Sequence, residues 1–506
     1  MYIRSISSIV ASILIIVITV AIAGIFYAFT SGLFGSITQS SSQQVQQQSQ
    51  VTSFTINNIY CSNNTLYLII YNNGNIPIDT NEAITIISYN QNAYNTTITC
   101  NNTTIIQPGQ QITCNLNNII CYYDPLSNSK YKVSLIVGGE KAEKYLGTGY
   151  GATPLLPGYS YLRDVIIDNS LNSNSLTDYQ ILVTLDTQSL ISQGKMRSDC
   201  GDIRFTDFDG ALLNYWIEPN TCNTSNTKIW VKVPFIPGGS TETIYLWYGN
   251  PNATSQSSVA NTFIAEIDGL VACWHFDEGS GNVSYDSSGN NHTAIIYGAT
   301  WVNGYYGKAL QYDGVDDYVS FSNITLGDTY TFVLWAKTLS PRIGSNPSDA
   351  YIWLNWQYCG DYAKGILLSS QGYFFFQDCG VSSIPNSGFV INSYVYPQTN
   401  VWYFLAAVRN SSSAYFYVNG TLVGSVTGLS GYNSTSNFGF LSRMFNTYYS
   451  NVIDEVYIFN QALSEEEITD LYNYYGYTTL NYPGIVLVRK YTSPEPSVIL
   501  GTEVET

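Results

Sequence analysis

The chain opens on a long apolar stretch that contrasts with everything after it. Residues 6–34 read ISSIVASILIIVITVAIAGIFYAFTSGLF, and no charged residue appears between Arg4 and Asp79. A mostly apolar run of about 20 residues is long enough to cross the hydrocarbon core of a membrane as a helix. Arg4 places the short N-terminal end in the cytoplasm and sends the rest of the chain out. The pattern therefore predicts a hydrophobic membrane helix within residues 1–35.

Polar and alternating patterns replace the apolar one after residue 35. Residues 36–51 are mostly Ser and Gln, which predicts a linker that is either flexible or a polar continuation of the helix. Residues 52–150 alternate hydrophobic and polar positions between Asn-rich turns, as in TLYLIIYNNGNIPI, and predict a small β-sandwich. Strand-and-turn patterns continue after a GATPLLPG linker through residues 160–258, 265–475 and 476–506. We therefore expect a mainly β protein, with one long N-terminal helix followed by tandem β-sandwich domains.

Composition supports an all-β surface protein. The sequence has 44 Tyr, 21 Phe, 9 Trp and 40 Gly, but only 11% charged residues, against about 25% in an average soluble protein. Aromatic residues suit pleated, half-buried strands, and Gly and Asn suit the turns between them. The formal net charge of −17 argues against a nucleic-acid partner, which requires a basic surface to neutralise phosphates.

The nine cysteines fall into local groups and include no C-x-x-C motif. With only two His in the chain, a zinc site is not expected. Local grouping fits disulfides formed in an oxidising compartment, whereas the alternative is that some are buried thiols. The predicted pairs are Cys61–Cys121, Cys100–Cys114, Cys200–Cys222 and Cys359–Cys379, which leaves Cys273 free.

The first thirty or so residues resemble the N-termini of archaeal type IV pilins and archaellin-like subunits. The likeness rests on the order of a basic residue, small polar residues and an Ile/Val/Ala helix in RSISSIVASILIIVITVAIAGIFYAF. It implies cleavage between Arg4 and Ser5, after which the helix packs with other pilin-like subunits in an extracellular filament. The early acidic residue that many pilins carry is missing here, which puts filament assembly in doubt. The alternative is an uncleaved signal anchor.

Two further resemblances cover the β-domains. Residues 160–258 resemble a domain family of unknown function found in prokaryotic surface proteins, on the phrases DIRFTDFDG, YWIE and the closing YGNP. Residues 265–475 resemble the laminin-G-like, concanavalin-type jelly roll, on LVACWHFDEGSG, DSSGNNHTA, YGKALQYDGVDDYVSF and IDEVYIFNQALSEEEITDLY. Within the last phrase, Ser464 and Glu467 have the spacing of a capping box that opens a short helix. We interpret residues 476–506 as strands that return to complete the second unit, residues 160–258, or to close the head assembly. The less favoured alternative is an edge strand donated to a neighbouring subunit.

The jelly-roll resemblance implies calcium and carbohydrate as candidate ligands. Calcium takes 6–8 oxygen ligands in a flexible geometry, and the candidates are Asp286, Asn290 and Asp454. The alternative is that these residues shape turns, which Asx residues do routinely. Candidate sugar-stacking aromatics are Trp353, Trp356, Tyr358 and Tyr373, beside the predicted Cys359–Cys379 disulfide. In so aromatic a chain, core or rim packing is the alternative interpretation for them.

Catalysis is not expected. Glycoside hydrolases need two carboxylates facing each other about 5–10 Å apart. The acidic pairs found here, such as Asp316–Asp317 and Asp454–Glu455, are adjacent, so their side chains should point to opposite faces of a strand. For His275 and His292 we expect a structural or surface role and not a catalytic one.

The sequence as a whole predicts a surface protein. Sequons for N-glycosylation occur at Asn63, Asn95, Asn102, Asn223, Asn252, Asn282, Asn323, Asn410, Asn419 and Asn433. The preferred hypothesis is a pilin-like surface subunit that presents adhesive, carbohydrate-binding β-domains. The alternatives are a membrane-anchored lectin or envelope protein that never polymerises and, less favoured, an exported glycan-active enzyme.

Overall fold

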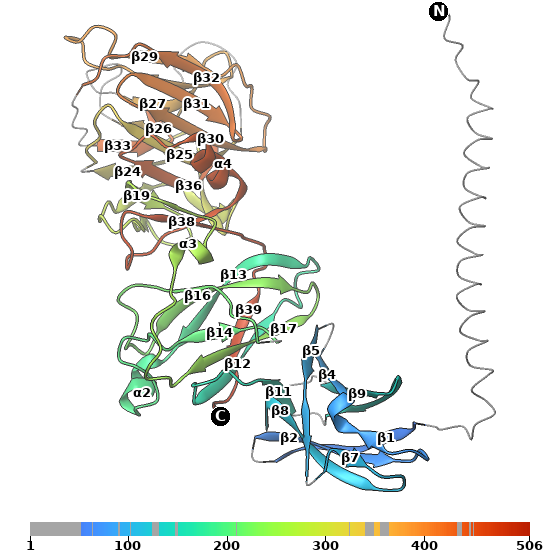
Figure 1. The fold of residues 1–506 in the computed structure, drawn as a ribbon. Coiled ribbons are helices and arrows are strands. Elements are labelled where there is room, and N and C mark those ends of the chain that lie inside the picture. The colour runs from blue at the N-terminus through green and yellow to red at the C-terminus, as the bar shows by residue number, and fades with distance from the viewer. Residues whose placement is uncertain are drawn as a thin grey trace, which may run out of the picture. The chain divides into compact units, whose positions relative to one another are not determined.

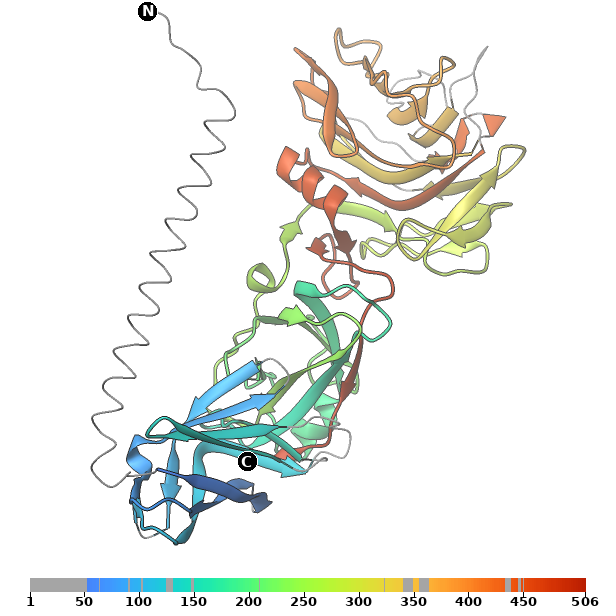
Figure 2. The same cartoon turned by 90° about the vertical axis from the view of Figure 1, so that its right-hand side faces the viewer.

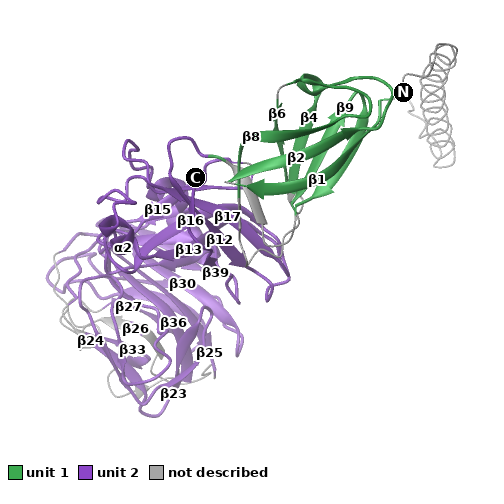
Figure 3. Ribbon diagram, turned by 90° about the horizontal axis from the view of Figure 1, so that it is seen from below, with its two compact units in different colours: residues 1–155 green, residues 156–506 purple. Residues whose placement is uncertain are grey.

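The computed structural model divides the chain into two compact units, residues 1–155 and 156–506 (Figure 3). It describes residues 52–506 apart from 63, 90–91, 102, 124–130, 147–149, 209, 323, 340–348, 355–363, 433–437, 445–446 and 449. Each unit is described below by itself.

The first unit is a β-sandwich whose core comes from alternating strand positions. In β2 (Thr65–Asn72), Leu66, Leu68 and Ile70 are fully buried while the residues between them are half-exposed, as a strand with one face on a core requires. One sheet holds β1 (Phe54–Ser62), β2, β8 (Gln111–Tyr123), β11 (Tyr150–Pro154) and, paired with β8, β6 (Ile98–Cys100). The other sheet holds β10 (Glu140–Tyr145), β9 (Lys132–Val137), β4 (Ile84–Tyr89) and β5 (Asn92–Thr96). A short ribbon of β3 (Ile78–Asp79) and β7 (Ile105–Ile106) flanks the 3₁₀ helix η1 (Thr80–Glu82).

Disulfides reinforce both units. Cys61–Cys121 and Cys100–Cys114 close the first unit, and Cys200–Cys222 closes a loop in the second. Cys379 is also disulfide-bonded, and its predicted partner Cys359 lies outside the described residues. Cys273 is a buried free thiol.

The second unit begins with another sandwich, completed by the last strands of the chain. One sheet has the order β14 (Arg204–Thr206), β17 (Thr241–Tyr248), β12 (Tyr161–Asp168) and β39 (Ser497–Leu500), with β40 (Val504–Glu505) also on β12. The facing sheet holds β13 (Leu176–Leu185), β16 (Thr227–Ile236) and β15 (Tyr215–Ile217). Two short helices, α2 (Thr187–Ser192) and α3 (Val259–Thr262), follow β13 and β17. Figures 1 and 2 show β39 running among strands that come much earlier in the chain, and its partner β12 precedes it by more than 300 residues.

The sequence phrases that single out this sandwich have structural roles. The Asp202 carboxylate accepts the amides of Arg197 and Gly249, so it joins the DIRF and YGNP phrases. Arg204 is buried and donates to the carbonyls of Ile203 and Thr254. These groups satisfy one another inside the domain, so the phrases mark how this sandwich is built.

The jelly roll consists of two eight-stranded sheets with the main core between them. The first sheet holds β22 (Thr300–Asn303), β23 (Lys308–Asp313), β36 (Ser450–Phe459), β25 (Tyr330–Thr338), β30 (Trp402–Arg409), β31 (Ser413–Val418), β32 (Thr421–Thr427) and, on β36, β19 (Leu270–Trp274). The second holds β20 (Val283–Ser284), β21 (Ala294–Tyr297), β24 (Tyr318–Ser322), β33 (Phe438–Leu441), β26 (Asp349–Leu354), β27 (Lys364–Leu368), β28 (Phe374–Asp378) and β29 (Phe389–Asn392). A small ribbon joins β34 (Arg443–Met444) and β35 (Thr447–Tyr448). The helix α4 (Glu465–Asn473) begins at the predicted capping box of Ser464 and Glu467.

A third, small sheet joins the jelly roll to the sandwich before it. It has the order β18 (Ala265–Ile267), β38 (Val486–Arg489) and β37 (Tyr475–Tyr477). Glu218, the acidic residue of the YWIE phrase, is fully buried and accepts hydrogen bonds from Tyr477, Thr479 and Asn481. The returning chain is therefore fixed to the sandwich by a buried carboxylate.

The predicted fold class needs one correction. The described residues are mainly β, but their helices are short. In the part of the chain that the structure describes, no helix is long and apolar enough to span a membrane. A long hydrophobic helix is therefore not an element of the described fold, and the segment predicted to form it, residues 1–35, lies outside the described residues together with Arg4 and Ser5.

Candidate functional site

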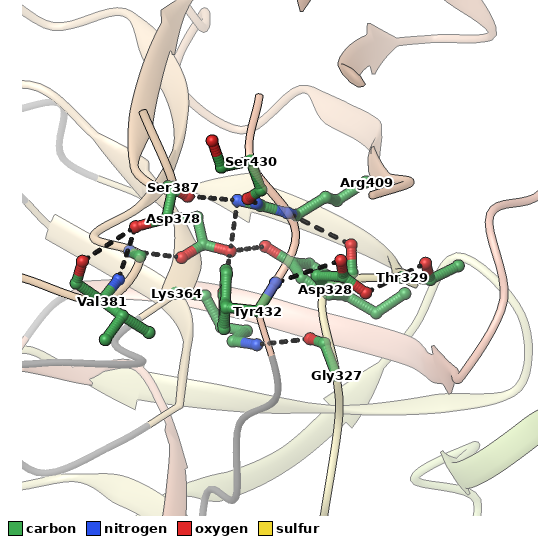
Figure 4. A network of polar contacts seen from close by, with 12 residues as sticks. Gly327, Asp328, Thr329, Lys364, Asp378, Val381, Ser387, Arg409, Ser430 and Tyr432 are labelled. Atoms are coloured by element: carbon green, nitrogen blue, oxygen red, sulfur yellow. Dashed lines mark hydrogen bonds and ion pairs between the residues drawn. The ribbon is translucent and has the colours of Figure 1, made fainter. Parts of the chain in front are cut away.

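A buried network of charged and polar groups fixes one end of the jelly-roll sandwich (Figure 4). The Asp378 carboxylate, at the end of β28, accepts hydrogen bonds through Oδ2 from Tyr330 at 2.7 Å, Tyr432 at 2.5 Å and Arg409 Nη1 at 3.1 Å. Arg409 also donates to the carbonyl oxygens of Ser387, at 2.8 Å, and Ser430, at 3.1 Å, and it is fully buried. Such complete pairing is what a buried ion pair needs to offset its desolvation.

Lys364 adds a second buried cation to this network. Its Nζ donates to the Gly327 carbonyl at 3.1 Å and lies 4.5 Å from the centre of the Tyr330 ring. Burial lowers the pKa of Lys364 from 10.5 to about 8, although Asp378 opposes that change. All of these groups face protein interior, so the network positions the β27–β28–β29 hairpins and is not itself a binding surface.

The opposite end of the same hairpins carries an exposed aromatic group, which we call the tyrosine platform: Tyr373, Tyr394 and Tyr396. Tyr373 is 9% exposed, whereas Tyr394 and Tyr396 are 66% and 58% exposed. The Tyr373 ring centre lies 5.2 Å from that of Tyr394 and 5.8 Å from that of Tyr396. One buried ring therefore supports two that face solvent.

The backbone holds Tyr394 in an unusual conformation. Its φ is 53°, in the left-handed region that costs a bulky residue about 1–2 kcal/mol. Hydrogen bonds on both sides impose it, because the Ser393 amide donates to the Phe374 carbonyl at 3.0 Å and the Phe374 amide donates to the Val395 carbonyl at 3.1 Å. A strained, exposed aromatic residue contributes little to the core, so its position points to a surface role.

The structure places the predicted sugar-stacking residues unequally. Tyr373 belongs to the tyrosine platform. The side chain of Trp353, in β26, and the whole of Trp356 and Tyr358 lie outside the described residues. Sequence reasoning missed Tyr394 and Tyr396, because aromatic residues are so frequent here that neither stands out.

The predicted calcium ligands are occupied by hydrogen bonds. Asp286 accepts the amides of Cys273 and Ser288 through Oδ1, at 2.9 Å each, and Asn290 donates to the Val271 carbonyl at 2.9 Å. Asp454 accepts the Tyr305 amide at 2.8 Å and belongs to β36. Among the described residues, the one acidic group compact enough for a cation is Asp313, Asp316 and Asp317. The turn-forming alternative therefore describes what Asp286 and Asn290 do in this structure.

A buried Cys–His–Glu arrangement lies where β19 meets β36. His275 Nδ1 lies 2.8 Å from Glu455 Oε2, and His275 Nε2 lies 3.5 Å from Cys273 Sγ and 2.7 Å from Thr478 Oγ1. Burial raises the pKa of the Cys273 thiol, which is the reverse of what a nucleophilic cysteine needs. Burial opposes protonation of His275, but the groups facing it, Glu455 among them, raise its pKa well above the usual value. This arrangement is a buried polar contact between strands.

A β-bulge at Glu455 makes the predicted orientation of Asp454 and Glu455 wrong. Glu455 has a φ of 51°, and the register between β25 and β36 shifts there. Both carboxyl groups are buried, as is almost all of β36, and burial together with Glu455 raises the pKa of Asp454 well above its usual value. A bulge inserts an extra residue, so strict alternation fails at that point.

The sequons in the described residues differ in access. The exposed ones are Asn95, Asn223, Asn252 and Asn282, and the half-buried ones are Asn410 and Asn419. Asn63, Asn102, Asn323 and Asn433 lie outside the described residues.

Comparison with protein families identifies two domains. Residues 199–301 match the family described as Domain of unknown function (DUF2341). Residues 313–469 match the Concanavalin A-like lectin/glucanases superfamily, the laminin-G-like class. The chain thus contains a DUF2341 domain and a laminin-G-like, concanavalin-like domain. Neither match reaches residues 1–35, so the resemblance to pilins gains no support.

Several solved structures align with about two fifths of the chain at low identity and low TM-score. Domain 4 of an extracellular GH43 arabinanase from Geobacillus stearothermophilus, in complex with arabinotriose, is 20% identical, with a TM-score of 0.34 over 40% of this chain and 98% of that one. The binding domain of Paraclostridial Mosquitocidal Protein 1 is 17% identical, with a TM-score of 0.34 over 42% of this chain and 55% of that one. The binding domain of botulinum neurotoxin DC, in complex with SialylT, is 18% identical, with a TM-score of 0.32 over 41% and 51%. The chain therefore spans only about half of the two toxin domains. No curated protein sequence matches the chain.

Proposed function

We propose that this protein is an exported surface protein that binds carbohydrate through the tyrosine platform of its jelly roll. The observation that carries the proposal is the exposed, strained Tyr394, supported from behind by Tyr373. A sugar ring has an apolar face of C–H groups, which packs on an aromatic ring while its hydroxyls bond to phenol oxygens. The platform lies within residues 313–469, which match a superfamily of lectins and glucanases.

Two further features support this proposal. The disulfides of both units suit an oxidising environment outside the cytoplasm. The platform consists of aromatic rings, and the adjacent acidic pair Asp454 and Glu455 is buried. Binding without catalysis is therefore what we propose. Attachment to other subunits through residues 1–35 forms no part of the proposal, because those residues lie outside the described structure.

A Tyr394→Ala variant of the full-length chain should bind glycans about tenfold more weakly than the wild-type protein. The expected loss is that of one exposed aromatic contact, about 1.4 kcal/mol, which is tenfold in affinity. A glycan array identifies the ligand, and isothermal titration calorimetry then compares the two proteins.

The control is Tyr285→Ala, because Tyr285 is 67% exposed but lies away from the platform, in the loop between β20 and β21. It removes an equally exposed phenol and should leave the affinity unchanged. Equal affinities for the Tyr394→Ala and wild-type proteins would show that the platform is not the binding surface.

A further inference from the structure

A cavity in the second unit lies where the jelly roll meets the sandwich before it, and we call it the junction cavity. Its volume is about 570 Å³, within the range of pockets that hold small ligands. Its walls come from β13, β16, β37, β38 and the segment that enters β39. The residues that matter below are Tyr179, Trp230, Tyr475, Tyr477, Arg489 and Glu495.

Arg489 forms the charged centre of this cavity. It is 4% exposed, and its guanidinium carbon lies 5.0 Å from the Trp230 ring centre and 4.9 Å from the Tyr475 ring centre. Its Nη1 donates to Glu495 Oε1 at 2.6 Å and its Nη2 donates to Glu495 Oε2 at 3.2 Å. Nη1 also donates to the Lys490 carbonyl at 2.9 Å, whereas the buried Nε–H has no hydrogen-bond partner. The guanidinium is therefore held at this wall by Glu495, by the Lys490 carbonyl and by the two aromatic rings.

Glu495 and Tyr179 set the chemistry of the opposite wall. The Tyr179 hydroxyl donates to Glu495 Oε1 at 2.7 Å, while the Glu495 side chain remains 39% exposed. The Trp230 indole ring lies against the Tyr477 ring, with 4.8 Å between the ring centres, and its N–H is buried without a hydrogen-bond partner. The cavity thus offers a solvated carboxylate acceptor and aromatic surface beside a buried guanidinium.

The charges in and around the cavity favour a neutral ligand over an ionic one. Arg489 and Glu495 neutralise each other inside the cavity, and the chain as a whole carries −17, which disfavours an acidic ligand. A neutral molecule with several hydroxyl groups can donate to the exposed Glu495 carboxylate without leaving a charge unpaired. Aromatic walls beside a few polar groups are typical of a site for such a molecule.

We propose that the junction cavity is a second carbohydrate site, which takes a short neutral oligosaccharide. The choice of carbohydrate rests on the proposed function, whereas the location is independent of the tyrosine platform. The site requires both neighbours, since Tyr179 and Trp230 belong to the DUF2341-type sandwich while Tyr475 and Arg489 follow the jelly roll. It therefore assigns a role to the sandwich of unknown function.

The test uses the full-length chain and a panel of maltotriose, cellotriose, arabinotriose and the acidic sugar trigalacturonic acid. Thr184 is exposed and lines the cavity, so Thr184→Trp fills the cavity without altering a core position. We expect a neutral trisaccharide to bind, and Thr184→Trp to weaken that binding at least about tenfold. Thr421→Trp, at an exposed position of β32, is the matched control and should leave it unchanged.

A second readout comes from Trp230, whose indole fluorescence should change on ligand addition. A Trp230→Phe variant should lose that change, and Tyr394→Ala should retain it. A fluorescence change that survives Thr184→Trp, preference for trigalacturonic acid, or no binding by any of the panel would each overturn the inference. Loss of the fluorescence change in Tyr394→Ala alone would overturn it while supporting the tyrosine platform, whereas loss in Thr184→Trp alone would support the junction cavity and leave the platform to the test described for it above.

Discussion

An Arg409→Met variant is expected to destabilise the jelly roll by about 3–5 kcal/mol, the cost of breaking a buried ion pair by removing one partner. Methionine is similar in length but leaves the Asp378 carboxylate buried without its cation, although Tyr330 and Tyr432 still donate to it. The carbonyl oxygens of Ser387 and Ser430 also lose their donor. Urea unfolding followed by tryptophan fluorescence measures the loss.

The control for this experiment is Arg197→Met. Arg197 also pairs with an aspartate, Asp199, but their side chains are 36% and 58% exposed. An exposed pair contributes about 0–1 kcal/mol, so the free energy of unfolding of this variant should be close to that of the wild-type protein. If the Arg409→Met and Arg197→Met variants showed the same small decrease in the free energy of unfolding, Arg409 would not be the stabilising partner that its contacts indicate.

The free energy of unfolding of the wild-type protein should depend on pH between about pH 8 and pH 10.5, and a Lys364→Met variant should lose that dependence. The pKa of Lys364 is lowered to about 8 by burial, so in this window the unfolded chain holds a proton that the folded chain has released. Stability therefore rises with pH across the window, because the unfolded state binds more protons. Across the whole window, the change in the Lys364 pKa corresponds to about 3 kcal/mol in the free energy of unfolding.

The measurement compares the free energies of unfolding of the two proteins at about pH 7.5 and about pH 9.5. Over that range the wild-type protein should gain about 2 kcal/mol relative to the Lys364→Met variant. Stopping at pH 9.5 limits ionisation of the tyrosines in the unfolded chain, and groups common to both proteins cancel. A Lys308→Met variant, changed at an exposed lysine, should follow the wild-type protein. Parallel curves for the wild-type and Lys364→Met proteins would contradict the buried, proton-releasing lysine.

The sequence predicted the parts of the structure that depend on neighbours along the chain. Alternation and turn residues predicted strands, local grouping predicted the disulfides, and the Ser464–Glu467 spacing predicted the start of α4. The family resemblances of both β-domains were confirmed because their phrases are long and ordered.

Features that depend on distant parts of the chain were not predicted. Nothing local in the sequence marks the bulge at Glu455, so strict alternation gave the wrong orientation for Asp454. Trp230 and Arg489 are far apart in sequence and meet only because the chain returns across the junction. The strain at Tyr394 arises from backbone hydrogen bonds of Phe374, which no pattern of residue types reveals.

The return of the chain has a mechanical consequence. Residues 265–475 leave the DUF2341-type sandwich through β18 and come back through β37 and β38 to β39, which pairs with β12. The jelly roll is thus tethered by two covalent connections that lie side by side in one sheet. A tensile load on the jelly roll is shared between them, because β39 is held in the sandwich by its pairing with β12. Pulling the jelly roll away from the sandwich therefore has to break the β12–β39 pairing as well as extend the connection through β18, which a simple string of domains does not require.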